Sequence, residues 1–219
     1  METNEEISKN VMKTGTSLVG IVCKDGAAIA ADRRATVGGQ LVSQKDFQKV
    51  RHVTDYFITA IAGNASDAIL LTKILGAELK LKELKTKSRP TVSEAANLLS
   101  MSSYRNIRTP ALIPNIVATI SGGFNEDGTI ELFSTSPAGD LMKVKDYAAD
   151  GSGMTFIMGL LERQYKKDMS LKEAVELAKE CLKSSTQRDT ASGNGIDVFT
   201  ITKDGINHVV SEEIIPQYK

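Results

Sequence analysis

The chain has 219 residues, 41% apolar and 25% charged, and its 27 basic and 27 acidic residues balance. This composition is that of one globular domain with a sizeable core, and it favours neither nucleic acid nor a membrane surface as a partner. With two histidines and the widely separated Cys23 and Cys181, the sequence predicts no metal site, no cofactor and no disulfide, but reduced core cysteines in a cytoplasmic protein.

Residues 1–15 form a charged leader without periodicity, and they lack the basic and apolar regions of a secretion signal. We expect this leader to lie outside a single domain of residues 16–219. Cleavage between Gly15 and Thr16 would expose a hydroxyl and an α-amine on one residue. An α-amine with a pKa of about 7.7–8.0 can act as the base for its own hydroxyl. A disordered tail running into the first strand is the alternative, and these residues taken alone favour it.

The first half of the chain predicts hairpin-linked strands. Residues 16–23 and 27–32 form the first hairpin around Lys24-Asp25-Gly26, and a second pair is expected at 40–43 and 49–53. A strongly apolar strand follows at 56–62 and ends at Gly63-Asn64.

Two helices come next. The first spans about residues 66–84, and its expected buried stripe consists of Ile69, Leu70, Ile74, Ala77, Leu81 and Leu84. The second begins at Thr91, which has capping-box spacing to Glu94. Strands resume at 116–120, 129–134 and 141–143.

A third helix opens after Gly153, and a fourth begins at a second capping box formed by Ser170 and Glu173. A last hairpin pairs residues 196–202 with 206–210. Hairpin-linked strands predict antiparallel sheets, and each helix pair must bury its apolar stripe against one sheet. The order therefore predicts an α+β fold, a four-layer αββα sandwich of two antiparallel sheets between helix pairs.

Five separated motifs strongly resemble those of a proteasome β subunit, archaeal in style. They are Gly15-Thr16, Ala31-Asp32-Arg33-Arg34-Ala35-Thr36, Ile61-Ala62-Gly63, Gly151-Ser152-Gly153, and Gln187-Arg188-Asp189-Thr190-Ala191-Ser192-Gly193. The match covers nearly the whole chain in order. It implies the N-terminal nucleophile hydrolase fold and a threonine endopeptidase that degrades unfolded proteins after removing its own leader.

The resemblance assigns the reacting groups. By this resemblance, Thr16 stands at the position of the family's nucleophile. Gly15 stands at the position of the last residue that autolysis removes. Asp32 and Lys49 would form a buried ion pair that favours deprotonation of the hydroxyl. Lys45 is the less favoured candidate for the lysine, because an apolar residue directly follows Lys49.

The same resemblance implies that Ser152, Asp189 and Ser192 hold the new α-amine, and that the Gly63 N–H forms the oxyanion hole. Each residue also has a simpler interpretation. Asp32 could form a salt bridge at a strand end, Lys49 could be solvated, Ser152 could cap a helix, and Asp189 could pair with Arg188.

The expected substrate pocket is formed by Ala35, Ile61 and Ala65. Small apolar walls favour an apolar side chain before the cut, because a charged one would be left unpaired. Ser17 and Leu18 stand where the family commonly has threonines, and this should leave the chemistry of Thr16 intact.

A nucleophile able to cut almost any unfolded chain must be separated from folded proteins. The resemblance implies a homo-heptameric β ring stacked on a second β ring, outer rings of α subunits, and a regulatory ATPase that feeds unfolded polypeptides. Two alternatives remain open: a catalytically silent structural β subunit that keeps residues 1–15, and a related amidase that acts on a small molecule.

Overall fold

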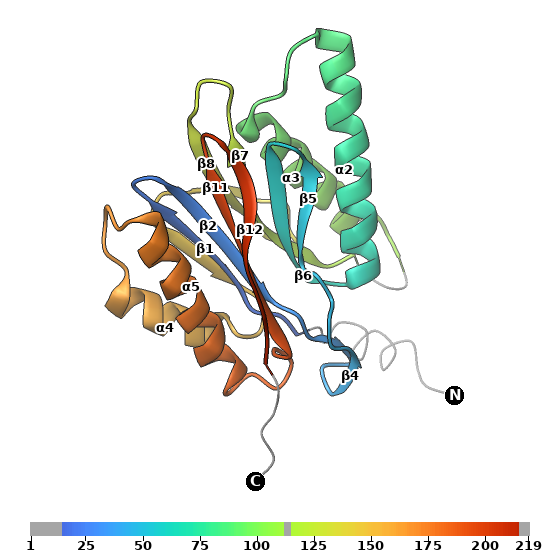
Figure 1. The fold of residues 1–219 in the computed structure, drawn as a ribbon. Helices are drawn as coiled ribbons and strands as arrows, with labels where there is room; N and C mark the ends of the chain where they lie inside the picture. Colours follow the sequence, from blue (N-terminus) through green and yellow to red (C-terminus); the bar gives the residue numbers. More distant parts are fainter. Residues whose placement is uncertain (1–14, 112–114, 215–219) are drawn as a thin grey trace.

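The computed structural model describes residues 15–111 and 115–214. Residues 1–14 of the expected leader and residues 112–114 and 215–219 lie outside this part. Two antiparallel sheets stack face to face, and a pair of helices covers the outer face of each (Figure 1). The expected four-layer αββα sandwich is therefore confirmed.

The first sheet has the strand order β10-β1-β2-β11-β12. Its strands are β1 (Leu18–Cys23), β2 (Gly26–Asp32), β10 (Tyr147–Asp150), β11 (Gly195–Thr202) and β12 (Gly205–Glu213). The second sheet has the order β5-β6-β7-β8-β9. Its strands are β5 (Val50–Thr54), β6 (Phe57–Gly63), β7 (Val117–Phe124), β8 (Ile130–Thr135) and β9 (Leu141–Val144). A small hairpin of β3 (Ala35–Val37) and β4 (Leu41–Gln44) stands apart from both sheets.

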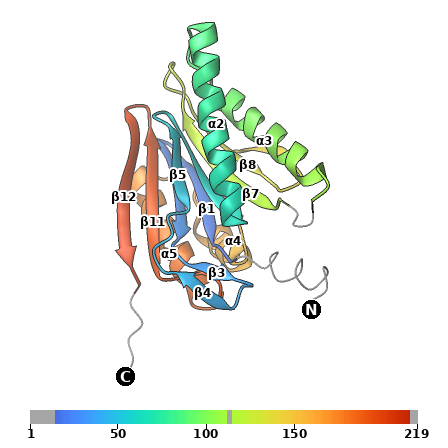
Figure 2. The same cartoon turned by 90° about the vertical axis from the view of Figure 1, so that its right-hand side faces the viewer.

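The helices pack in sequential pairs. Helices α2 (Ala65–Thr86) and α3 (Val92–Arg108) cover the second sheet, whereas α4 (Met154–Gln164) and α5 (Leu171–Thr186) cover the first (Figure 2). Both predicted capping boxes form: Thr91 with Glu94 begins α3, and Ser170 with Glu173 begins α5. In the described residues, no helix is both long and apolar enough to cross a membrane.

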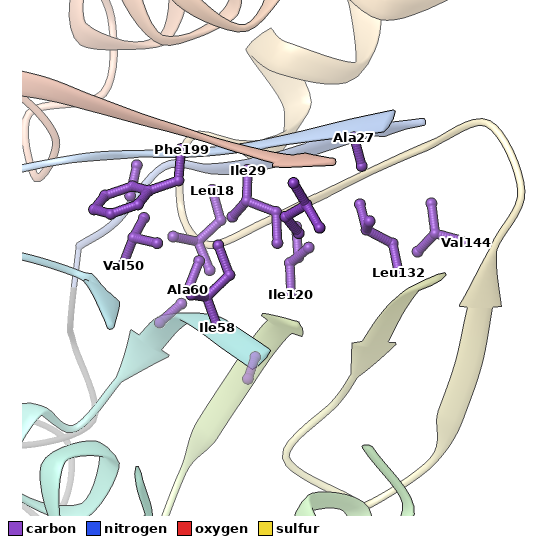
Figure 3. Close-up of a cluster of buried hydrophobic side chains, with 14 residues drawn as sticks. Leu18, Ala27, Ile29, Val50, Ile58, Ala60, Ile120, Leu132, Val144 and Phe199 are labelled. Carbon is purple, nitrogen blue, oxygen red and sulfur yellow. The ribbon is translucent and has the colours of Figure 1, made fainter. Parts of the chain in front are cut away.

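The central core lies between the two sheets and draws its side chains from both (Figure 3). Leu18 and Ile29 of the first sheet face Ile58, Ile120 and Leu132 of the second. Since neighbouring residues of a strand point to opposite faces, the next residues of β1 and β2 pack against α4 and α5 instead. All seven residues of β2 are consequently buried, including the acidic residue at its end.

Several predicted elements differ in detail. The expected pairing of residues 40–43 with 49–53 is wrong, because β4 pairs with β3 and β5 pairs with β6. Strand β7 continues to Phe124, beyond the expected end at Ile120. The short edge strand β10 was not predicted, and it pairs with β1.

The expected buried stripe of the first helix is also wrong. The residues of α2 that are buried are Ala68, Leu71, Leu75 and Leu79. Leu70, Ile74, Leu81 and Leu84, which were expected in the core, are exposed. The helix carries apolar residues on two faces, so apolar spacing alone does not identify the face that meets the sheet.

Candidate active site

The candidate site lies where the start of β1, the end of β2 and the start of β5 meet. Thr16 directly precedes the Ser17–Leu18 entry into β1, Asp32 ends β2, and Lys49 directly precedes β5. All three side chains are buried: Thr16 is 4% exposed, Asp32 0% and Lys49 2%. The two sheets thus bring a hydroxyl, a carboxylate and an ammonium group to one point out of water.

The Asp32 carboxylate is fully surrounded by donors. Its Oδ1 accepts from the Ser17 N–H at 2.9 Å and from Lys49 Nζ at 2.7 Å, and its Oδ2 accepts from the Arg34 and Gly193 N–H groups at 3.0 and 2.9 Å. The neighbouring arginine side chains bind other groups: Arg33 pairs with Asp46 and Asp197, and Arg34 donates to Asn194 Oδ1 and to the Thr190 carbonyl oxygen. Asp32 therefore holds Lys49 and ties together three separate segments.

Lys49 forms the second half of the buried ion pair. Burial lowers the pKa of its ammonium group from the ordinary value, and the charge and hydrogen bond of Asp32 oppose that shift. Its Nζ also donates to the carbonyl oxygen of Gly15 at 3.2 Å. Lys45, the other candidate, is exposed.

The Thr16 hydroxyl points at the peptide bond that precedes it. Its Oγ1 donates to the Gly15 carbonyl oxygen at 2.5 Å. The Thr16 N–H on the other side donates to Ser152 Oγ at 3.1 Å. The nitrogen that cleavage would release as an amine thus already faces a hydroxyl.

A chain of hydroxyls and one carboxylate extends from this nitrogen. Ser152 and Ser192 both donate to Asp189 Oδ2 at 2.6 Å, and Ser192 Oγ lies 2.8 Å from Ser17 Oγ. Ser17 Oγ in turn contacts Ser185 Oγ. Ser152 does not cap α4, whose N-cap is Gly153 without a side-chain hydrogen bond. The structure therefore brings together Thr16 and all five of the other residues predicted for the catalytic centre: Asp32, Lys49, Ser152, Asp189 and Ser192.

Comparison with known proteins identifies the family. The model of the proteasome subunit family matches residues 12–201. The chain belongs to the proteasome subunit family. It is 38% identical to a proteasome subunit beta of Methanocaldococcus jannaschii over 205 residues, 94% of this chain and 89% of the relative. It is 37% identical to that of Nanoarchaeum equitans over 197 residues (90% and 98%), and 36% identical to that of Methanococcus maripaludis over 214 residues (98% and 95%). It is thus a proteasome β subunit of archaeal type.

In this proteasome β subunit a cleft opens beside Thr16. Its walls include the predicted pocket residues Ala35, Ile61 and Ala65, together with Gly63. Within the part of the chain that the structure describes, the Gly15 carbonyl oxygen accepts hydrogen bonds from Thr16 and Lys49. Gly63 lines the cleft, but its N–H forms no hydrogen bond to that oxygen.

Glycine is required at two positions around the cleft. A Cβ on Gly15 would stand 1.8 Å from Ala191 Cβ. Gly63 has φ +117°, and a Cβ there would stand 2.0 Å from the Ile116 carbonyl oxygen. Both side-chain-free positions let the backbone approach the site closely.

Three further residues line this cleft that the sequence did not predict for the pocket: Arg34, Thr36 and Phe47. Thr36 directly follows the predicted Ala35 and could have been found from the motif that contains both. Phe47 comes from the irregular segment after β4, and no periodic signal places it. Within the described residues no three histidine, cysteine, aspartate or glutamate side chains are grouped as metal ligands.

Proposed function

We propose that this chain is the proteolytic β subunit of a proteasome core particle, a threonine endopeptidase that removes residues 1–15 from itself. The observation that carries the proposal is the buried Gly15 carbonyl oxygen, which accepts hydrogen bonds from Thr16 Oγ1 and from Lys49 Nζ. The two donors polarise the bond that autolysis must cut, and one of them is the attacking group.

Autolysis follows from this geometry. Thr16 Oγ1 adds to the carbonyl carbon of Gly15, the C–N bond breaks, and the hydroxyl proton passes to the Thr16 nitrogen. The resulting ester is hydrolysed by water, which releases the leader as a carboxylic acid and restores the hydroxyl. The products are a free α-amine and a free hydroxyl on Thr16.

The mature site would use the same groups on a peptide substrate. The α-amine, held near Ser152 and the Asp189–Ser192 pair, takes the hydroxyl proton as the general base. The Lys49 charge stabilises the developing oxyanion of Thr16, and the Gly63 N–H is positioned by its strand end to bind the oxyanion of the substrate. An acyl-enzyme forms on Thr16 and is then hydrolysed by water.

This activity requires a compartment, since the nucleophile has little selectivity of its own. We infer a chamber of two stacked homo-heptameric β rings between rings of α subunits, in the cytoplasm, supplied with unfolded polypeptides by a regulatory ATPase. Proteasome membership supports a core assembly with α subunits.

The test is co-expression of the chain with its α subunit, followed by intact mass and hydrolysis of an apolar fluorogenic peptide. The wild-type chain should begin at Thr16 and cleave the peptide, whereas Thr16→Ala should keep its leader and lack activity in an assembled particle. Thr155→Ala, an exposed position on α4, is the matched control. A wild-type particle that keeps residues 1–15 and cleaves nothing would identify a silent structural subunit instead.

A further inference from the structure

Ser185 lies one residue before the end of α5, and its side chain is fully buried. A serine or threonine hydroxyl inside a helix can donate to the carbonyl oxygen four residues before it, as Thr72 and Ser102 do in α2 and α3. The Ser185 hydroxyl instead contacts Ser17 Oγ, beside the start of β1. Helix α5 therefore directs this hydroxyl to the segment that carries Thr16.

A continuous chain of serine hydroxyls connects α5 to Asp189. Ser185 Oγ contacts Ser17 Oγ, which lies 2.8 Å from Ser192 Oγ. Ser192 Oγ in turn donates to Asp189 Oδ2 at 2.6 Å. All three serines are 0% exposed, so bulk water reaches none of their hydroxyls.

The carboxylate fixes the direction of every hydrogen bond in this chain. An ionised carboxylate only accepts hydrogen bonds, and each serine hydroxyl has one proton to donate. Because Ser192 donates its proton to Asp189, it can only accept from Ser17. Because Ser17 then donates to Ser192, it can only accept from Ser185. Ser185 is thus the terminal donor of the chain.

The far end of the chain reaches the nitrogen of Thr16. Asp189 Oδ2 also accepts from Ser152 at 2.6 Å, and Ser152 Oγ accepts from the Thr16 N–H at 3.1 Å. The backbone of Ser185 holds Asp189 too, because its carbonyl oxygen accepts from the Asp189 N–H at 2.8 Å. Ser185 therefore fixes Asp189 directly through its main chain, and through its hydroxyl by way of the other serines.

The two hydroxyls at the start of the chain are also enclosed by α4. A Cβ on Gly153 would stand 2.0 Å from Ser17 Oγ and 2.2 Å from Ser185 Oγ. The Gly153 N–H donates to the Thr16 carbonyl oxygen at 3.2 Å, so the hydroxyl pair and the backbone of Thr16 pack against the same residue. In the described residues Ser185 Oγ makes no other hydrogen bond. The chain therefore has no exit for a proton, and its role is to hold groups in place.

We propose that Ser185 is a positioning residue of the peptidase. Its hydroxyl completes the chain that orients Asp189, and Asp189 in turn orients the α-amine of Thr16 through Ser152. The described lining of the cleft beside Thr16 includes none of the three buried serines, so Ser185 acts on the general base and not on the substrate. This inference rests on the proposed peptidase function and adds a residue of α5 to the active site.

The charges around Thr16 set the sign of the expected pH effect. They come from the ends of β2 and β10, the segment before β5 and the segment after α5: Asp32, Arg34, Asp150, Lys49 and Asp189. Substitution of Ser185 changes none of these charges. It removes the last donor of the chain, so less of the Asp189 charge is spread over the hydroxyls and more of it acts on the α-amine. A negative charge favours the ammonium form, so the pKa of the amine should rise.

The experiment uses the particle assembled from the full chain and its α subunit, with kinetics measured once intact mass shows that the β chain begins at Thr16. Ser185→Ala should lower kcat for the apolar fluorogenic peptide by about three- to tenfold and change KM by less than about twofold. The acidic limb of its kcat/KM profile, which reports the base of the free enzyme, should move to higher pH. Ser184→Ala is the matched control, because Ser184 is a half-buried serine of the same helix outside the chain of hydroxyls. It should leave kcat, KM and the acidic limb unchanged.

Ser17→Ala separates the hydrogen-bond chain from packing. It interrupts the chain between Ser185 and Ser192, and should lower kcat by about tenfold. In this background the Ser185 hydroxyl no longer acts on Asp189, so adding Ser185→Ala should lower kcat by less than about a further twofold. If Ser185 only filled space, its loss would lower kcat by the same factor in both backgrounds.

Two results would overturn the inference while leaving the peptidase function intact. One is a Ser185→Ala particle with the kcat and the acidic limb of the wild type. The other is a loss that is equally large with and without the Ser17 hydroxyl, which would assign Ser185 to packing. A wild-type particle that cleaves no peptide would overturn the peptidase function and this inference with it.

Discussion

The Thr16 hydroxyl and the Lys49 ammonium group donate to the same atom, the carbonyl oxygen of Gly15, at 2.5 and 3.2 Å. Thr16 is the residue after that carbonyl, whereas Lys49 reaches it from the start of the other sheet. The peptide bond before Thr16 is therefore polarised only when the two sheets have packed. Folding and activation of the bond are coupled in this arrangement, so an unfolded chain should not process itself.

Replacing Asp32 by asparagine should slow leader removal strongly and shift its pH dependence. The carboxylate opposes the effect of burial on Lys49, so without it the pKa of Lys49 falls further below its ordinary value. If charged Lys49 is required, the alkaline limb of the rate profile moves to lower pH. Intact mass followed over time at a series of pH values measures both effects.

Asp204→Asn is the matched control for this variant, because Asp204 is exposed in the β11–β12 turn. It should process like the wild-type chain at every pH. An Asp32→Asn chain whose alkaline limb stays at the wild-type position would show that the charge on Lys49 does not depend on its partner, and the assigned role of the pair would be wrong.

Gly15→Ala should block or severely slow processing. The new Cβ would stand 1.8 Å from Ala191 Cβ and 2.5 Å from the Ala191 carbonyl oxygen, so the Gly15 carbonyl must leave the position that Thr16 and Lys49 recognise. Gly159→Ala in α4 meets no atom within 4 Å, and should process normally while stabilising the helix by up to about 1 kcal/mol. The fraction of chain that begins at Thr16 is the readout. Normal processing of Gly15→Ala would mean that the close contact is absent during cleavage.

The residues of the candidate site could be predicted because each lies in a short motif beside a clear element boundary. Asp32 ends an apolar strand, Ser152 precedes a helix between two glycines, and Asp189 follows a helix. Lys49 was harder to identify, because the irregular segment after β4 has no periodic pattern that would fix which lysine faces the site. Only the apolar Val50 that follows it favoured Lys49 over Lys45. The hydrogen bonds that join these groups cannot be read from spacing, since they connect residues as distant as Thr16 and Ser152.

Some parts of the fold could not be predicted for physical reasons. Strand β10 has only half-buried residues and lies at a sheet edge, so it lacks both the alternation and the apolar run that indicate a strand. The buried face of α2 was predicted wrongly because the helix carries apolar residues on two faces, and only its packing on the second sheet decides which face is buried.

The two cysteines should differ in reactivity. Burial raises the pKa of the Cys181 thiol to about 12, so almost none of it is thiolate at pH 8. Cys23 at the end of β1 is half-buried, and burial raises its pKa as well, but it remains partly accessible. Iodoacetamide should therefore label Cys23 before Cys181 in the folded chain, and both in denaturant. Faster labelling of Cys181 in the native protein, measured by peptide mapping, would contradict its placement in the core.

Two leucines of α2 test which face of this helix meets the sheet. Leu75 is 2% exposed and packs in the cluster beneath α2, whereas Leu84 is 66% exposed. Leu75→Ala should lower the free energy of unfolding by about 2–5 kcal/mol because it leaves a cavity. Leu84→Ala should change it by less than about 0.5 kcal/mol, since it removes no buried contact and alanine favours helix. Urea unfolding of the chain purified without α subunits measures both, so that subunit contacts cannot add to the cost at Leu84. If Leu84→Ala were the more damaging change, the stripe expected from apolar spacing would be the buried one after all.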